Sequence, residues 1–119
     1  MKGRDVRTYL HDIKQACDAL RRFAQGRTLT DYLSDEMFRS AVERKFEIVG
    51  EALRRVITLE PTFAERITDH RRIIDFRNRL IHGYAVIDDE VVWGILESRL
   101  QQLEEEIDQL LIEGEDHPG

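Results

Sequence analysis

The chain has few of the residues that restrain or interrupt a polypeptide: one cysteine, two prolines and seven glycines among 119 residues. The single cysteine, Cys17, forms no internal disulfide, which suits a reducing compartment, so we expect a cytoplasmic protein. So little proline and glycine leaves scant material for a turn-rich β fold. Residues 1–6 also lack the apolar segment of a signal peptide.

Several kinds of functional site are missing as well. The longest apolar run, residues 91–96, is far shorter than the roughly 20 residues that cross a bilayer. The four histidines lack metal-ligand spacing and there is no cysteine pair, so we predict neither a metal nor a cofactor. No glycine-rich phosphate loop or nucleophile elbow is present. After these exclusions, the remaining functions are metal-free catalysis by a soluble protein, or binding to a partner.

The length and charge bound the domain and its partners. At 119 residues the chain forms one domain, which we assign to residues 1–113, with residues 114–119 as a disordered tail. The net charge of −6 argues against a protein that coats nucleic acid. That charge is concentrated in residues 97–119, which carry a net −7, so we expect this acidic segment to face solvent or a protein partner.

Apolar periodicity predicts an all-α fold. Residues recur at spacings of three and four in four segments, residues 4–25, 34–57, 70–82 and 88–112. Ser34 and Asp88 are candidate N-caps, and Pro61 is expected to start a short helical turn. Gly50 costs about 1 kcal/mol inside a helix relative to alanine, which predicts a close helix–helix contact. Short connections predict an up-and-down bundle of four to five helices.

One octapeptide, residues 77–84, carries most of the chemistry. It reads Arg-Asn-Arg-Leu-Ile-His-Gly-Tyr. Arg77 can hold a phosphate in a fork of N–H donors, and His82 can move protons near neutral pH. RNA carries its own nucleophile in the 2′-OH, so these two residues are candidate catalytic groups for metal-free RNA cleavage. Asn78, one turn before His82, is a candidate supporting residue that fixes the ring.

The positions of these residues leave alternatives open. Arg77 projects into the apolar arc of its helix, so it meets either an acid in a salt bridge or a substrate phosphate. A helix C-terminal cap is the plainer role for His82, and Tyr84 is equally compatible with covering the end of the bundle. Arg77 and His82 point about 140° apart on a regular helix, so either the helix loosens at Gly83 or two chains pair. We favour pairing, and hence a homodimer, with some distortion at the end of the helix.

Two acids on the second predicted helix form a further candidate pair. Glu47 and Glu51 lie one turn apart, as a general acid and base can. Salt bridges to Arg44, Arg54 or Arg55 on the same face are the favoured interpretation.

The octapeptide resembles known signatures. Arg77-x4-His82 matches that of HEPN domains, and with Tyr84 it matches the Arg-x4-His-x-Tyr form of HepT-like toxins. The resemblance extends over nearly the whole chain, through residues 4–5, 9–10, 13, 47–52 and 91–93. It implies a homodimeric all-α bundle that is a metal-independent endoribonuclease acting on tRNA or mRNA. It further implies a toxin–antitoxin pair, in which a minimal nucleotidyltransferase neutralises the toxin by AMPylating Tyr84.

Two other functions fit the same residues. The first is a non-catalytic helical bundle that only binds a nucleotidyltransferase. The second is a structural dimer in which Arg77 is salt-bridged and His82 caps its helix. Cleavage of RNA in the presence of a chelator separates the ribonuclease from both.

Overall fold

The computed structural model describes residues 2–83 and 87–116, and all regular structure in them is helical. The elements are α1 (Lys2–Ala24), α2 (Leu29–Ser34), α3 (Glu36–Leu59), the 3₁₀ helix η1 (Pro61–Arg66), α4 (His70–His82), α5 (Asp89–Ser98) and α6 (Leu100–Asp116). The all-α prediction is therefore confirmed. Helix α6 continues through the first three residues of the predicted tail, and residues 117–119 lie outside the described residues.

Side-chain caps set where the helices begin. Asp88 caps α5 as predicted, accepting a bond from the backbone N–H of Glu90 at 3.0 Å. The predicted cap Ser34 was wrong, because Asp35 caps α3 by accepting from the N–H of Phe38 at 3.1 Å. Ser34 instead ends α2, a short helix that the periodicity did not predict.

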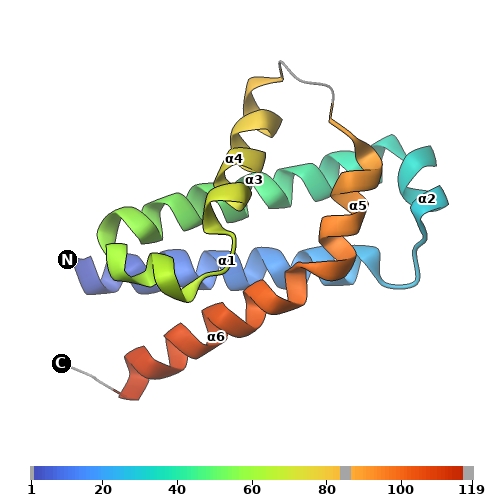
Figure 1. Ribbon diagram of the computed structural model, residues 1–119. Helices are drawn as coiled ribbons and strands as arrows, with labels where there is room; N and C mark the ends of the chain where they lie inside the picture. Colours follow the sequence, from blue (N-terminus) through green and yellow to red (C-terminus); the bar gives the residue numbers. More distant parts are fainter. Residues whose placement is uncertain (1, 84–86, 117–119) are drawn as a thin grey trace.

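The last predicted helix is two helices in the structure. The helix is interrupted at Arg99: α5 ends at Ser98, and α6 begins at Leu100 in a new direction (Figure 1). Apolar spacing continues across the break, so periodicity alone predicts one helix. The break lets α5 contact α2 while α6 runs back along α1.

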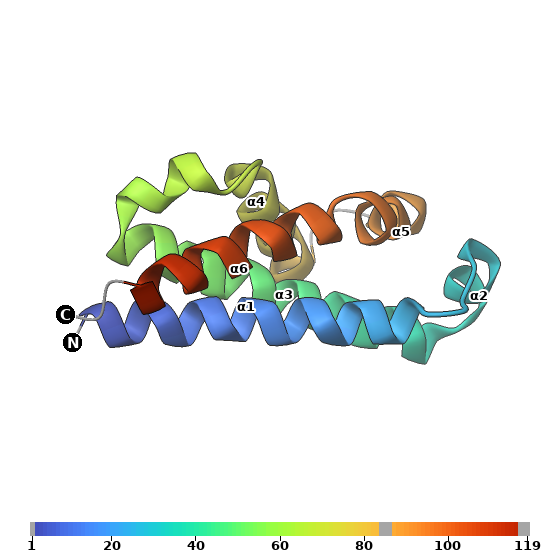
Figure 2. The same cartoon turned by 90° about the horizontal axis from the view of Figure 1, so that it is seen from below.

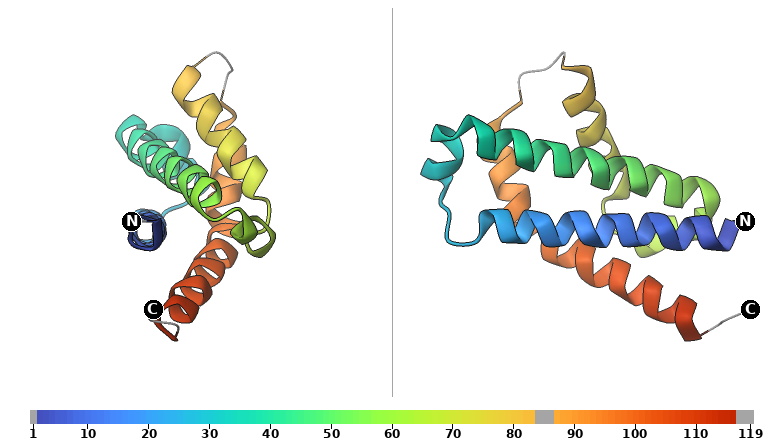
Figure 3. Two further views of the ribbon diagram at one scale, coloured as in Figure 1. Left: turned by 90° about the vertical axis from the view of Figure 1, so that its left-hand side faces the viewer. Right: turned by 180° about the vertical axis from the view of Figure 1, so that it is seen from behind.

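Helix α3 is the central element. It lies between α1 and α4, as the end-on view shows (Figure 3, left), and it makes the most extensive contacts with both. From below, α6 runs alongside α1 (Figure 2). Helix α4 crosses α3 and rises beyond it on the side away from α1 (Figure 1). The C-terminal end of α4, which carries the octapeptide, therefore stands away from the layer of α1 and α6.

The core is built from the apolar stripes of α1, α3, α5 and α6. Its fully buried members include Ile13, Leu20, Val42, Leu53 and Ile107. None of the thirteen described residues of α4 is buried to this degree, although five of them are large and apolar. Among the described helices, none combines the length and apolar character that crossing a bilayer requires.

The acidic α6 is held by basic side chains of its own chain. Glu104 accepts from Arg21 at 2.6 Å, and Asp108 pairs with Lys14 at 2.6 Å, so α6 is tied to α1. Glu113 pairs with Arg66, the last residue of η1. Much of the expected acidic surface is thus used within the molecule rather than left for a partner.

Candidate active site

Helix α4 carries the candidate residues in a regular backbone. It runs through His82 and ends at Gly83, whose φ of 64° lies in the left-handed region that favours glycine. The N–H of Gly83 donates to the carbonyl of Arg79 at 3.2 Å, which satisfies a helix-end acceptor. The predicted stop at Gly83 is confirmed, and His82 is the last helical residue. The expected distortion at the helix end was wrong, because α4 stays α-helical through His82.

Arg77 lies where α4 crosses α3, directly against Gly50. A Cβ placed on Gly50 would stand 2.2 Å from the Cβ of Arg77 and 2.7 Å from its Cγ. Real carbon atoms do not approach so closely without moving, so only glycine permits this crossing. The close helix–helix contact predicted at Gly50 is confirmed.

The guanidinium of Arg77 is held by two acceptors. Its Nη2 contacts Oε2 of Glu51 at 2.7 Å, and its Nη1 donates to Oδ1 of Asn78 at 2.9 Å. Its Nε is buried and has no hydrogen-bond partner among the described residues. The side chain is 21% exposed, so its charged end reaches the surface. The predicted acid partner therefore exists, but it lies at the surface rather than in the core.

Glu51 joins three arginines. Its Oε1 accepts from Nη2 of Arg54 at 2.9 Å and from Nε of Arg55 at 3.1 Å, while Oε2 faces Arg77. The hydrogen bond from Arg54 is the largest of the contacts that lower the pKa of Glu51 below its ordinary value. One carboxylate faces three guanidinium groups, so the cluster keeps a net charge of +2.

The favoured interpretation of the two α3 acids is confirmed. Glu51 bridges to Arg54 and Arg55, and Glu47 pairs with Arg44 at 3.6 Å. Sequence reasoning missed the contact between Glu51 and Arg77. The two residues are far apart in the chain, and the only sequence signal for their contact was the helical glycine beside Glu51.

The other octapeptide residues lie around the end of α4. His82 is exposed. Because α4 is regular, its geometry places His82 about 140° around the helix from Arg77. Oδ1 of Asn78 accepts the bond from Nη1 of Arg77 at 2.9 Å, and the expected bond from Asn78 to the ring of His82 stays a prediction. Tyr84, the predicted modification site, lies outside the described residues.

Other reactive groups do not form a rival centre. Cys17 is fully buried in the core, and burial raises its pKa to about 12, so it is not a thiolate nucleophile. Among the described residues, no group of three His, Cys, Asp or Glu side chains is arranged to hold a metal ion.

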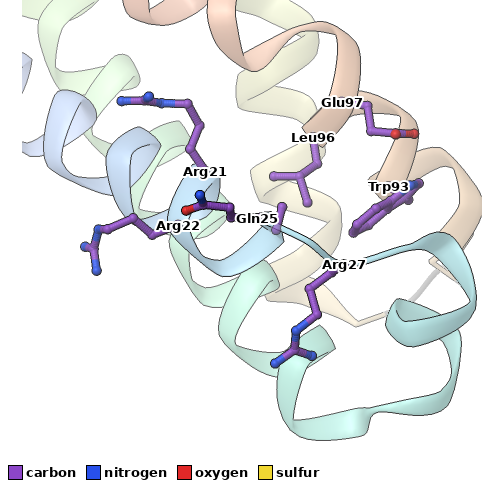
Figure 4. A pocket seen from close by; sticks show the side chains of 8 residues that line it. Arg21, Arg22, Gln25, Arg27, Trp93, Leu96 and Glu97 are labelled. Atoms are coloured by element: carbon purple, nitrogen blue, oxygen red, sulfur yellow. The ribbon is translucent and has the colours of Figure 1, made fainter.

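Several hollows among the described residues are lined by neither Arg77 nor His82. A groove of about 450 Å³ separates α4 from α5 and α6, with Phe46, Phe76 and Ile95 in its lining. A second pocket lies between the C-terminal end of α1 and α5 (Figure 4). Its arginines are engaged by the chain itself: Arg21 and Arg22 bond Asp18, and Arg27 lies over the ring of Phe38.

Comparison with known proteins points to the same family as the octapeptide. A family model described as "Ribonuclease HepT-like" matches residues 13–110, which contain Glu51, Arg77 and His82. The chain belongs to the HepT-like ribonuclease family. The resemblance stated from the sequence is therefore confirmed.

Relatives of this HepT-like protein carry matching names. A candidate RNase of Methanocaldococcus jannaschii is 30% identical over 98% of this chain and 97% of the relative. Another from the same organism is 29% identical over 91% of this chain and 98% of its own. A "Probable ribonuclease HepT" of Thermococcus cleftensis is 28% identical over 90% and 96% of the two chains. No solved structure matches this chain.

Proposed function

We propose that this protein is a metal-independent endoribonuclease that acts as the toxin of a cytoplasmic toxin–antitoxin pair. The observation that carries the proposal is the fixed guanidinium of Arg77, held by Glu51 and Asn78 on the helix that ends at His82. A permanent cation on the same helix as a proton-transfer group suits cleavage of RNA by its own 2′-OH.

The reaction divides between the two residues as follows. The 2′-oxygen attacks the adjacent phosphorus as its proton passes to a base, and the bond from phosphorus to the 5′-oxygen breaks. The leaving 5′-oxygen takes up a proton, which leaves a 2′,3′-cyclic phosphate and a 5′-hydroxyl. His82 serves as the base or as the acid in this step. Arg77 stabilises the charge that builds on the phosphorane oxygens.

The working unit in this proposal is a homodimer paired through α4. On a regular helix Arg77 and His82 of one chain face different directions, so a single copy does not present both to one phosphate. Ile81 lies between these two faces and is 46% exposed. A second copy packed against Ile81 and the half-buried Ile74 would remove this apolar surface from water and bring the two motifs together.

The remaining partner is a minimal nucleotidyltransferase antitoxin. Family membership supports this part of the proposal, with Tyr84 two residues beyond His82 in the matching signature. In the modification, the phenol oxygen of Tyr84 attacks the α-phosphorus of ATP and pyrophosphate leaves. The new phosphate then competes with RNA for Arg77.

Incubation of purified protein with total RNA in EDTA tests the activity. We expect cleavage that survives the chelator and that yields 2′,3′-cyclic phosphate ends. Loss of cleavage on removal of divalent ions would end the metal-free mechanism. Intact RNA, together with stable binding of the nucleotidyltransferase, would instead favour the non-catalytic binding partner.

A further inference from the structure

The carboxylate of Glu51 is fixed independently of α4. Its Oε1 accepts from Arg54 at 2.9 Å and from Arg55 at 3.1 Å, three and four residues later on the same helix. Such pairs form within one helix face and need no tertiary partner. Both of these bonds use Oε1. Oε2 accepts a longer bond of 3.4 Å from Nε of Arg54 and contacts Nη2 of Arg77 at 2.7 Å across the helix crossing. The acceptor is therefore oriented by contacts within α3 that do not involve α4.

The stem of Arg77 is fixed as well, which leaves only its charged end to be oriented. Its Cβ and Cγ lie against Gly50, where no side chain intervenes. Beyond that point, Glu51 holds Nη2 and Asn78 holds Nη1, each through one contact. A terminal guanidinium nitrogen carries two hydrogens, so each retains one for another acceptor. Oxygens of a phosphate are acceptors of the kind that such charged N–H groups bind.

We propose that Glu51 is a positioning residue which, with Arg54 and Arg55 behind it, orients the guanidinium of Arg77 toward an RNA phosphate. This rests on the proposed ribonuclease function. Glu51 engages only Nη2 of Arg77, so a phosphate can bind without breaking the bond between them. The cluster also keeps a net +2 charge, so it attracts the phosphate rather than repelling it. These two features favour a positioning role for Glu51 over an inhibitory one, in which Glu51 would keep Arg77 from binding phosphate.

Substitution of Glu51 by glutamine tests the role, because the amide keeps the shape and removes the charge. With a labelled RNA oligonucleotide we expect kcat to fall about tenfold or more, since a misoriented group loses transition-state contacts. KM should change by no more than about twofold. Glu47→Gln is the matched control: Glu47 lies one turn away and pairs only weakly with Arg44, so its kinetics should equal wild type.

Other kinetic outcomes overturn the proposal. A rise in kcat for Glu51→Gln would make Glu51 an inhibitory latch. Kinetics equal to wild type would remove it from the site altogether. If Glu51→Gln fails to fold, the double variant Arg54→Gln/Arg55→Gln keeps Glu51 but removes its support, and it should lower kcat in the same direction.

A second measurement does not depend on cleavage. The NMR signals of the Arg77 guanidinium, assigned by their loss in Arg77→Lys, should show slow rotation about Nε–Cζ in wild type. Rotation should become fast in Glu51→Gln and stay slow in Glu47→Gln. Equal rotation in all three would refute the positioning role. Wild-type protein that shows slow rotation but cuts no RNA would overturn the proposed function, and with it the role toward phosphate, while leaving the contact with Arg77 intact.

Discussion

Arg77 occupies a position on α4 where the apolar pattern calls for an aliphatic side chain. Its stem packs on Gly50 as such a side chain would, and its charged end reaches Glu51 at the surface. Removal of Arg77 would not strand the acid, because Glu51 keeps Arg54 and Arg55. The fold therefore depends little on this arginine. We infer that its positive charge serves the binding of a phosphate rather than stability.

That reasoning predicts a clean loss of function in single-residue variants. Arg77→Ala and His82→Ala should each lower RNA cleavage by about 100-fold or more, the scale seen when one transition-state contact or proton-transfer group is lost. Circular dichroism and thermal melting should still show a folded protein, because Arg77 is at the surface edge and His82 is exposed. A His82→Ala protein that cleaves normally would contradict the catalytic assignment.

Arg79→Ala is the control on the same helix. Arg79 is exposed and lines the groove beside α5 and α6, away from Glu51. We expect its loss to leave kcat within about threefold of wild type, with any effect confined to RNA affinity at low salt. Cleavage that needs Arg79 and tolerates loss of Arg77 would show that the site lies on the other face of α4.

At the residue scale, sequence reasoning succeeded where the cause was local. The pairs of Glu51 with Arg54 and Arg55 follow from helical spacing, and the stop at Gly83 follows from backbone freedom. The contact between Glu51 and Arg77 did not follow, because it depends on how two helices cross. Gly50 signalled that a crossing exists but not which α4 residue fills it.

The elements show the same division between local and tertiary causes. Helix α2 was missed although its sequence holds a capping box, in which Thr28 and Asp31 bond each other's backbone N–H groups at 3.2 and 2.9 Å. A capping box is formed by residues three apart in the sequence, so the start of α2 could have been predicted from the sequence. The interruption at Arg99 could not be predicted from the sequence, because apolar spacing continues through it. The change of direction instead depends on tertiary packing, of α5 against α2 and of α6 against α1.

The crossing of α3 and α4 gives a prediction at the element scale. Gly50→Ala places a methyl group 2.2 Å from the Cβ of Arg77, which is the rigid start of the side chain, so α4 must shift. We expect a loss of about 1–3 kcal/mol in the free energy of unfolding, and reduced cleavage because Arg77 moves with α4. Urea unfolding and the RNA assay measure the two effects.

Gly94→Ala is the matched control within another helix. In the described part of the chain, a Cβ on Gly94 would meet no atom within 4 Å. The substitution should therefore stabilise α5 by about 0.5–1 kcal/mol through helix propensity alone, with unchanged cleavage. Equal destabilisation of both variants would mean that the contact at Gly50 is not the cause.

On the scale of the whole molecule, α4 is the helix whose apolar side chains one chain covers only in part. None of its described residues is buried, and Ile81 is half exposed beside His82. A pair of chains joined at α4 predicts complementation in trans. When Arg77→Ala and His82→Ala chains are mixed and the heterodimer is isolated, about one site in two should regain both groups and activity. A verified heterodimer without activity would show that each working pair lies within one chain.

The antitoxin supplies the last prediction, which concerns how the assembled toxin is switched off. AMP attached to Tyr84, two residues beyond His82, would set an anionic phosphate near Arg77 and a bulky nucleoside over the approach to it. Tyr84→Phe removes only the hydroxyl that accepts AMP, so this variant should stay toxic yet resist neutralisation by the cognate nucleotidyltransferase with ATP. Intact-mass measurement after co-expression should find AMP on wild type and none on Tyr84→Phe. Equal labelling of both would place the modification on another residue, and the remaining tyrosines differ in access: Tyr32 is fully buried, whereas Tyr9 is partly exposed and would be examined first.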